Sequence, residues 1–149
     1  MIITKVHKKD IKKIYKLEKK VFCENAFTQE IISQLVSDHL VFWKMVMEGF
    51  FKKIIGFIIL IKDRKDRANL INFLINPKYQ GKGYGTLLLR KTLKHTRANF
   101  QEIVKIVLNV NVDNHFAIKI YKNHDFTIVK RIKNYYRTGD NAYLMELNI

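Results

Sequence analysis

The sequence predicts a mixed α/β fold, and three observations support this class. Apolar, strand-like runs alternate along the chain with segments that have helical spacing. One apolar run ends at a proline and a glycine-rich turn, and a helical pattern follows directly. The chain has 149 residues and 48% of them are hydrophobic, which is enough for a single domain over 1–149 with one core.

The elements are expected in the order strand, helix, helix, three strands, helix, strand, helix, strand, strand. The expected strands are 2–6, 40–47, 53–62, 68–75, 103–110, 126–133 and 141–148, and the expected helices are 8–22, 28–38, 84–97 and 114–123. Thr28 can cap the second helix, and Asn114 can cap the fourth. Glu48-Gly49 and the charged run 62–67 are turn signals between strands.

Cysteine content and hydropathy exclude several classes of protein. Cys23 is the single cysteine, so there is no internal disulfide and no multi-cysteine zinc site, and we expect no metal. The longest apolar stretch, 54–61, contains Gly56 and is far shorter than the roughly 20 residues of a membrane span. No signal peptide is visible, so the expected location is the cytoplasm, without membrane contact.

The net charge of +15 has two readings. It favours an acidic partner such as RNA or a ribosomal surface. It also fits a compositional bias, with 22 Lys against 6 Arg, and a solvated helix face. The densest lysine group falls on the first helix: Lys8, Lys9, Lys12, Lys13, Lys16, Lys19 and Lys20. Nucleic-acid contact is therefore an option and not a requirement.

The segment 75–86 has the chemistry of a diphosphate cradle. The first turn of a helix has N–H groups without intrahelical partners, and the helix dipole adds partial positive charge there. Glycine at 81, 83 and 85 lets the backbone approach a phosphate closely, and Lys82 adds a full charge.

Three other glycine motifs fit this segment poorly. The phosphate loop of nucleotide hydrolases requires Gly, four residues and then Gly-Lys-Ser/Thr, a spacing that the chain lacks. A dinucleotide fingerprint would need glycine where Thr86 stands. The RNA-recognition signature Lys-Gly-Tyr-Gly begins at Lys82 but continues into leucines that suit a helix.

Gln80-Gly81-Lys82-Gly83-Tyr84-Gly85 resembles the pyrophosphate-binding signature of the GNAT superfamily of acetyl-coenzyme A-dependent N-acetyltransferases. A second block, 106–126, resembles a later GNAT pattern at the familiar separation. Its matching residues are Asn114, Ala117, Ile118, Tyr121 and Phe126. Asp125 stands where the family has glycine, at a turn position that tolerates Asp.

This resemblance implies the GNAT fold, which is a mixed, mostly antiparallel sheet flanked by helices, and it covers the whole chain. It also implies acetyl-CoA as the acetyl donor. The residues that it assigns to the cofactor are Phe73, Leu74, Ile75, Gln80, Gly81, Lys82, Gly83, Tyr84, Gly85, Thr86, Asn114 and Tyr121.

Both ends of the chain are similar to RimI-type protein N-terminal acetyltransferases. Segment 18–35 resembles their Glu-x-x-x-Phe-x-x-Pro-Trp-Ser pattern, and Ala26 and Phe27 stand in place of the Pro-Trp pair. Segment 134–145 resembles their tail, which implies that Tyr135 and Tyr136 wall a peptide groove. The acceptor implied is a protein α-amino group, including a ribosomal one, and the enzyme is expected to be a monomer or weak dimer. Alternatives are a lysine, polyamine or other small-amine acceptor, or a noncatalytic acyl-CoA-binding or RNA-associated module.

The reaction implied is direct attack of the amine on the acetyl thioester, without a covalent enzyme intermediate. Backbone N–H groups around 73–75 would stabilise the oxyanion, and Tyr121 stands at the family's proton-donor position. Asn109 occupies the place of the family's glutamate base, and an amide cannot accept that proton. The alternatives are a water held by Asn109, Glu24 beside the substrate amine, or His115. Of these, Glu24 is favoured.

Overall fold

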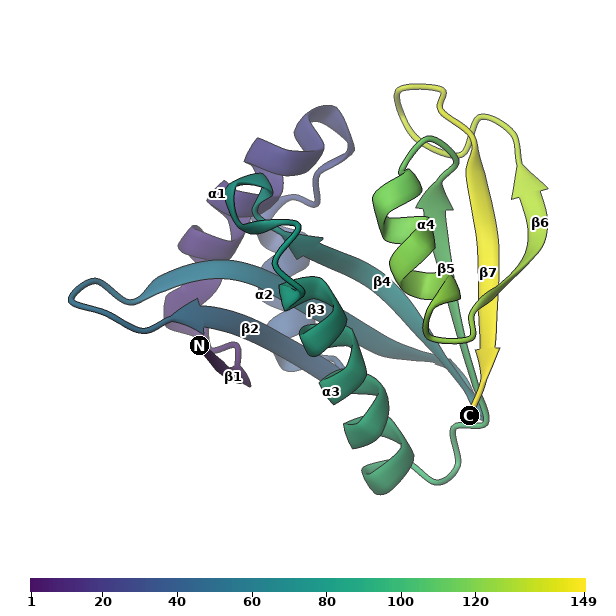
Figure 1. Cartoon of the computed structure of the whole chain (residues 1–149), viewed down its shortest axis with the longest axis horizontal. Coiled ribbons are helices and arrows are strands. Elements are labelled where there is room, and N and C mark those ends of the chain that lie inside the picture. The colour runs from purple at the N-terminus through teal and green to yellow at the C-terminus, as the bar shows by residue number, and fades with distance from the viewer.

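The computed structural model describes residues 1–149 and contains one seven-stranded sheet in the order β1-β2-β3-β4-β5-β7-β6. All neighbouring strands pair antiparallel except β4 and β5, which are parallel. The strands are β1 Ile2–Lys5, β2 Val41–Met47, β3 Lys53–Arg64, β4 Arg67–Ile75, β5 Lys105–Asn111, β6 Thr127–Ile132 and β7 Ala142–Asn148. The predicted fold class, a mostly antiparallel sheet flanked by helices, is confirmed (Figure 1).

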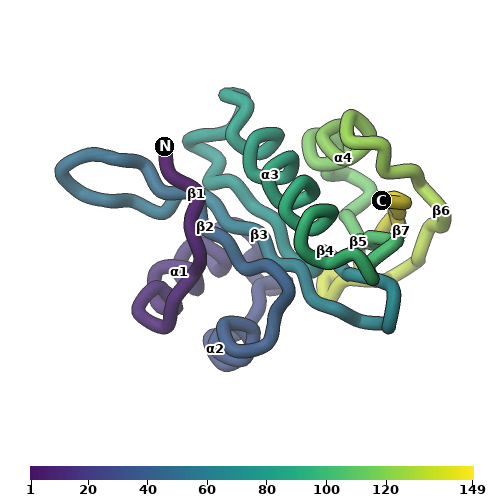
Figure 2. Tube along the Cα trace, turned by 90° about the horizontal axis from the view of Figure 1, so that it is seen from below, coloured from purple at the N-terminus to yellow at the C-terminus, as the bar shows by residue number.

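Helices cover both faces of the sheet (Figure 2). α1 Ile11–Phe22 and α2 Gln29–Ser37 lie on one face, and α3 Tyr84–Asn99 and α4 His115–Lys122 lie on the other. Each face has its own apolar core: eight buried residues on the α1/α2 side, including Ile14 and Phe57, and twenty-two on the α3/α4 side. None of the helices is both long and apolar enough to cross a bilayer.

Most element boundaries agree with the prediction, and the predicted caps form. Thr28 accepts from the Ile31 N–H at the start of α2, and Asn114 accepts from the Ala117 N–H at the start of α4. The expected helix 8–22 begins instead with a 3-10 turn over Lys8–Asp10.

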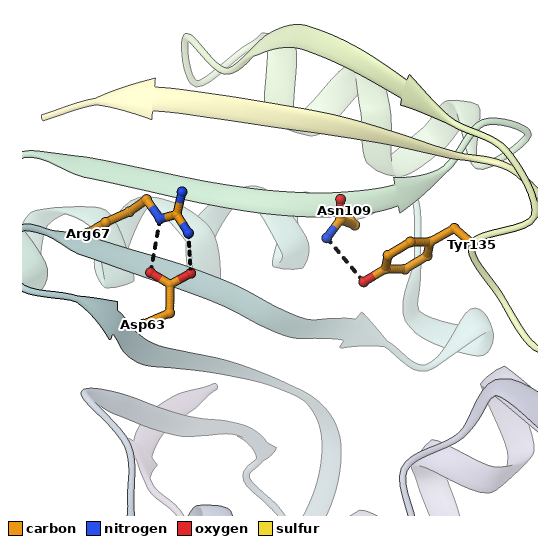
Figure 3. Close-up of polar contacts among 4 residues, drawn as sticks. All are labelled: Asp63, Arg67, Asn109 and Tyr135. Carbon is orange, nitrogen blue, oxygen red and sulfur yellow. Dashed lines mark hydrogen bonds and ion pairs between the residues drawn. The ribbon is translucent and has the colours of Figure 1, made fainter.

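The charged run 62–67 is mostly strand. The turn between β3 and β4 leaves only 65 and 66 outside the two strands, and Arg64 pairs with Arg67 across it. Arg67 donates two hydrogen bonds to the Asp63 carboxylate, at 3.0 and 2.8 Å, which close this end of the hairpin (Figure 3). The polar character of the run therefore reflects an exposed hairpin end and not a long loop.

The feature that positions the site is a gap between β4 and β5. The two strands pair only over Arg67–Leu70, and beyond that point they diverge in a V (Figure 1). On the other side of β4, the consecutive residues Ile59 and Leu60 of β3 pair with Asn72 and Leu70, so Ile71 is an extra, bulged residue. A bulge bends the strand and reverses which side chains face each layer, and this one lies where the gap begins.

Candidate active site

Four cavities follow one another along this gap, and each shares lining residues with the next. The first is a cradle cavity of about 270 Å³ around the glycine-rich turn and the start of α3. An apolar throat of about 80 Å³ follows, and it shares Ile75 and Phe116 with the cradle. The third is a chamber of about 150 Å³, which shares Phe73 and Ala117 with the throat. The last is an aromatic groove of about 240 Å³ beside Tyr135 and Tyr136.

The cradle cavity is built for an anion. The Leu87 N–H donates to the Gly83 carbonyl, which leaves the N–H groups of Tyr84, Gly85 and Thr86 without intrahelical partners at the N-terminus of α3. All three residues line the cavity. Its only charged lining residue is Lys119 of α4, so the backbone donors, the helix dipole and one ammonium group act on the same space.

Two of the three glycines serve different purposes. Gly83 precedes α3 with a φ of +79°, a left-handed conformation that side chains rarely adopt. A Cβ on Gly85 would lie 3.2 Å from Ile120 Cδ1 of α4 and 3.4 Å from Phe73 Cζ. Gly85 is therefore explained by close packing of α3 on its neighbours, and not only by approach to a phosphate.

The throat connects the cradle to the chamber along the free side of β4. The Gln80 side-chain amide donates to the Ile75 carbonyl at 2.8 Å and fixes the glycine-rich turn to the end of this strand. The Asn76 N–H donates to the Ile55 carbonyl of β3. Because strand backbone groups alternate in direction, we expect the N–H groups of Phe73 and Ile75 to point away from β3, toward the gap.

Tyr121 lines the chamber, the third cavity of this row, and 5% of its surface is exposed. Its ring packs between Phe73, with centroids 6.0 Å apart, and Phe126, with centroids 5.6 Å apart. Burial raises the pKa of its phenol, and the nearby Tyr136 raises it further. The phenol is thus protonated at neutral pH, as an ordinary tyrosine is, and burial makes it a weaker acid.

The aromatic groove lies under the loop between β6 and β7. Tyr135 and Tyr136 pack edge to face with centroids 4.9 Å apart, and the backbone N–H groups of both donate to the Asp140 carbonyl, at 3.0 and 3.1 Å. Burial, with a contribution from Tyr135, raises the pKa of Tyr136 to about 12. The Asn109 amide of β5 donates to the Tyr135 hydroxyl at 3.1 Å, which ties the loop to the strand (Figure 3).

One carboxylate lines the chamber, and it belongs to Glu18 of α1. Its side chain is almost completely buried, with 1% of the residue exposed. It accepts the Phe27 N–H at 2.9 Å through one oxygen and the Asn72 side-chain amide at 2.9 Å through the other. Burial raises the pKa of Glu18, while these two hydrogen bonds oppose the rise.

Most of the predicted site residues line these cavities. The cradle and throat include Phe73, Leu74, Ile75, Gln80, Gly81, Gly83, Tyr84, Gly85, Thr86 and Asn114, and the chamber and groove include Phe27, Asn109, Tyr121, Tyr135 and Tyr136. Three candidates lie elsewhere. Lys82 is exposed with its ammonium group 6.0 Å from the Tyr79 ring, and Glu24 and His115 are exposed and line none of the four cavities. The side chain of Glu24 is thus exposed and outside the chamber lining, whereas its neighbour Asn25 is part of that lining.

The sequence reasoning missed Glu18, Asn72, Asn25 and the α4 residues that face the cradle. Two of these residues, Glu18 and Asn72, could have been recognised from the sequence as polar residues at core positions. Glu18 stands on the apolar stripe of α1, four residues after Ile14, and Asn72 stands two residues from Leu74 on a buried strand face. A polar residue at a core position is expected to have a specific partner.

Comparison with known proteins agrees with this geometry. Residues 9–126 match the acetyltransferase (GNAT) family. The N-alpha-acetyltransferase of Sulfolobus acidocaldarius is 33% identical over 79 residues, which are 53% of this chain and 46% of that protein. The N-alpha-acetyltransferase RimI of Mycobacterium tuberculosis is 36% identical over 72 residues, 48% of this chain and 42% of that protein. The matches thus span less than half the length of these two relatives.

A solved structure extends the likeness to the whole chain. The structure of Ard1 from Thermoplasma volcanium superposes with a TM-score of 0.88 at 27% identity, and covers 99% of this chain and 97% of that one. The predicted GNAT membership and the similarity to RimI-type proteins are confirmed. The chain belongs to the acetyltransferase (GNAT) family.

Proposed function

We propose that the protein transfers the acetyl group of acetyl-CoA to the α-amino group of a protein or peptide N-terminus. The observation that carries this proposal is the row of cavities, in which an anion cradle at one end and an aromatic groove at the other are joined through the throat and the chamber that Tyr121 lines. A cofactor and an acceptor can therefore reach Tyr121 from different ends. Relatives named N-alpha-acetyltransferase support this acceptor class.

The cavities fit acetyl-CoA in shape and chemistry. The cradle, with its open helix N-terminus and Lys119, would hold the diphosphate, and the apolar throat along β4 would take an extended, uncharged arm. When bound, acetyl-CoA supplies the thioester whose acetyl group is transferred. Gln80 maintains the shape of the turn through its hydrogen bond to Ile75.

The chain's own residues supply three functions at the meeting point. The N–H groups of Phe73 and Ile75 are the candidates to stabilise negative charge that develops on a carbonyl oxygen. Tyr121 holds a proton for a departing sulfur. The aromatic groove orders the acceptor backbone, and Asn109 anchors the loop that forms it.

The proposal is tested by measuring thiol release from acetyl-CoA with a panel of acceptors. The panel contains short peptides with varied first residues, the same peptides with blocked N-termini, lysine-only peptides and polyamines. We expect turnover with a subset of free-N-terminal peptides and none with their blocked forms. Turnover confined to lysine or polyamine acceptors would establish the alternative acceptor class. Coenzyme A binding without any turnover would instead favour a noncatalytic module.

The charge of +15 leaves room for a ribosomal or other acidic partner near the substrate. The affinity of such a contact should fall steeply with salt. In a plot of the logarithm of the binding constant against the logarithm of the salt concentration, each neutralised phosphate should add about one unit to the negative slope. If turnover does not depend on salt, either with free peptides or with a ribosome-bound acceptor, the positive charge has no role in binding the acceptor and reflects amino-acid composition.

A further inference from the structure

The exposed side of α1 carries a concentration of positive charge that the proposed reaction does not use. Segment 8–20 contains seven lysines, a quarter of the 28 basic residues of the chain, and all seven are exposed. None of them lines the cradle, the throat, the chamber or the aromatic groove. We call these seven lysines the basic face.

The charge of the basic face is not neutralised within the protein. None of its lysines forms an ion pair. The two carboxylates of the same segment, Asp10 and Glu18, are buried and hydrogen-bonded on the inner side of the helix. One carboxylate of α2, Glu30, lines a surface groove together with Lys8 and Lys12. It cannot balance seven ammonium groups, so the basic face keeps most of its charge.

The stability of α1 does not explain this arrangement. Lys12 and Lys13 lie in the first turn of the helix, which has no acidic residue and where the helix dipole disfavours cations. Lys12, Lys16 and Lys20 follow one another at i, i+4 spacing, at which like charges repel each other. A bound polyanion would remove this repulsion.

The chemistry of the basic face favours a nucleic acid over other acidic partners. Interfaces between proteins are depleted in lysine and enriched in aromatic residues and arginine, whereas every cation of this face is lysine. A helix that binds a membrane surface presents apolar side chains to the lipid, but those of α1, such as Ile14 and Leu17, are buried in the core. Lysine binds phosphate as a point charge and reads no base. Segment 8–20 is about 18 Å long at 1.5 Å per residue, which matches about five phosphates along one strand.

We propose that the basic face is a docking surface for the phosphate backbone of RNA, which it binds without regard to base sequence. Binding of a phosphate backbone goes beyond the proposed function and does not depend on it. The choice of RNA over DNA rests on the proposed function, because its acceptor is a polypeptide N-terminus and polypeptides are made beside RNA.

The position of α1 allows RNA and acetyl-CoA to bind together. α1 lies on the opposite face of the sheet from α3, whose N-terminus forms the cradle (Figure 2). At its other end α1 approaches the acceptor side, because Phe22 lines the chamber and Asn25 donates to Thr138 of the β6–β7 loop at 3.1 Å. Glu24, exposed between them, would repel phosphates and confine the contact to α1 itself. RNA on the basic face would thus leave the cradle open and lie next to the acceptor end.

The test measures the affinity of a labelled RNA duplex by fluorescence anisotropy at several salt concentrations. One variant replaces four lysines of the basic face: Lys9→Gln, Lys12→Gln, Lys13→Gln and Lys16→Gln. The matched control replaces four exposed lysines scattered over other elements: Lys52→Gln, Lys65→Gln, Lys94→Gln and Lys122→Gln. None of the eight forms an ion pair, and each variant lowers the net charge from +15 by four, to +11. Glutamine has nearly the helix propensity of lysine, so both variants should fold.

We expect the basic-face variant to bind the duplex at least tenfold more weakly than the wild type. The negative slope of log affinity against log salt should fall by about one unit for each phosphate contact that is lost. The control should bind within about threefold of the wild type and keep its slope. Duplexes of equal length and different sequence should bind alike. Coenzyme A affinity and turnover of short peptides should be unchanged in both variants.

Equal losses of affinity in the two variants would overturn the inference, because binding would then follow total charge and not this surface. Tighter binding of anionic lipid vesicles, of polyglutamate or of a DNA duplex than of the RNA duplex would overturn the choice of partner. RNA binding that depends on the basic face, in a protein that acetylates no peptide, would remove the proposed function and support the docking surface.

Discussion

Replacing Tyr121 with phenylalanine removes one hydroxyl group from a residue that lines the chamber. The ring can keep its packing against Phe73 and Phe126, at centroid distances of 6.0 and 5.6 Å. Only burial and the charge of Tyr136 shift the pKa of this hydroxyl, with no hydrogen bond among the causes, so we expect its loss to leave no buried partner unpaired. The melting temperature should therefore stay the same or rise slightly.

Turnover should respond very differently. A positioned general acid contributes about 10²–10⁴-fold to a rate, which corresponds to about 3–5 kcal/mol of activation free energy. We expect Tyr121→Phe to lower kcat by that range while the dissociation constant of coenzyme A stays within twofold. The assay is thiol release with the best peptide from the acceptor panel, beside calorimetry with coenzyme A. Turnover within about threefold of the wild type would refute the assignment of Tyr121 as proton donor.

Three further substitutions test the cradle, the buried carboxylate and the close packing of β3 on β4. Gly83→Trp should abolish coenzyme A binding by filling the cradle. Gly49→Trp on the β2–β3 hairpin is the control and should bind coenzyme A like the wild type. If both variants keep the wild-type affinity, the glycine-rich turn is not the binding site for the cofactor. Because burial raises the pKa of Glu18, the folded state binds this proton more tightly than the unfolded state, so wild-type stability falls as pH rises from the ordinary value through the folded pKa. Glu18→Gln should lack this loss, so the melting temperature of the variant minus that of the wild type should rise between about pH 4 and pH 7. A difference in melting temperature that stays constant over this range would contradict a raised pKa of Glu18. In Gly56→Ala, the new Cβ would lie 2.5 Å from Ile75 Cδ1 and 2.7 Å from a β4 backbone oxygen, which should destabilise the fold by about 1–3 kcal/mol, seen as a lower urea midpoint.

The order of elements and the cofactor end of the site could be predicted because their signals are local. The apolar periods, the Thr28 and Asn114 caps and the glycine-rich turn each depend on residues within a few positions of one another. The run 62–67 misled the prediction of strand ends, since charged residues at an exposed hairpin resemble a loop.

The acceptor end could be predicted only in part, because its contacts join distant segments. Tyr121 and Tyr135 were predicted from the family resemblance. Glu18 and Asn72 were not, because they are 54 residues apart in sequence and come into contact only in the folded structure, where Glu18 of α1 meets Asn72 of β4. No local pattern indicated that Glu24 would face outward while Asn25 lines the chamber. The bulge at Ile71 lies where the gap begins, and it depends on the register of β4 with β3, which composition does not indicate.

The gap between β4 and β5 has a consequence for how broadly such a protein can act. A free strand edge inside a folded sheet offers main-chain donors and acceptors that any extended polypeptide can match, whatever its side chains. Under the proposed function the throat along this edge takes the cofactor arm through such main-chain groups, so discrimination between acceptors would come from the few side chains of the aromatic groove. A small number of substitutions in the β6–β7 loop could then redirect the protein to new targets while the cradle, the throat and the chemistry at their junction stay as they are.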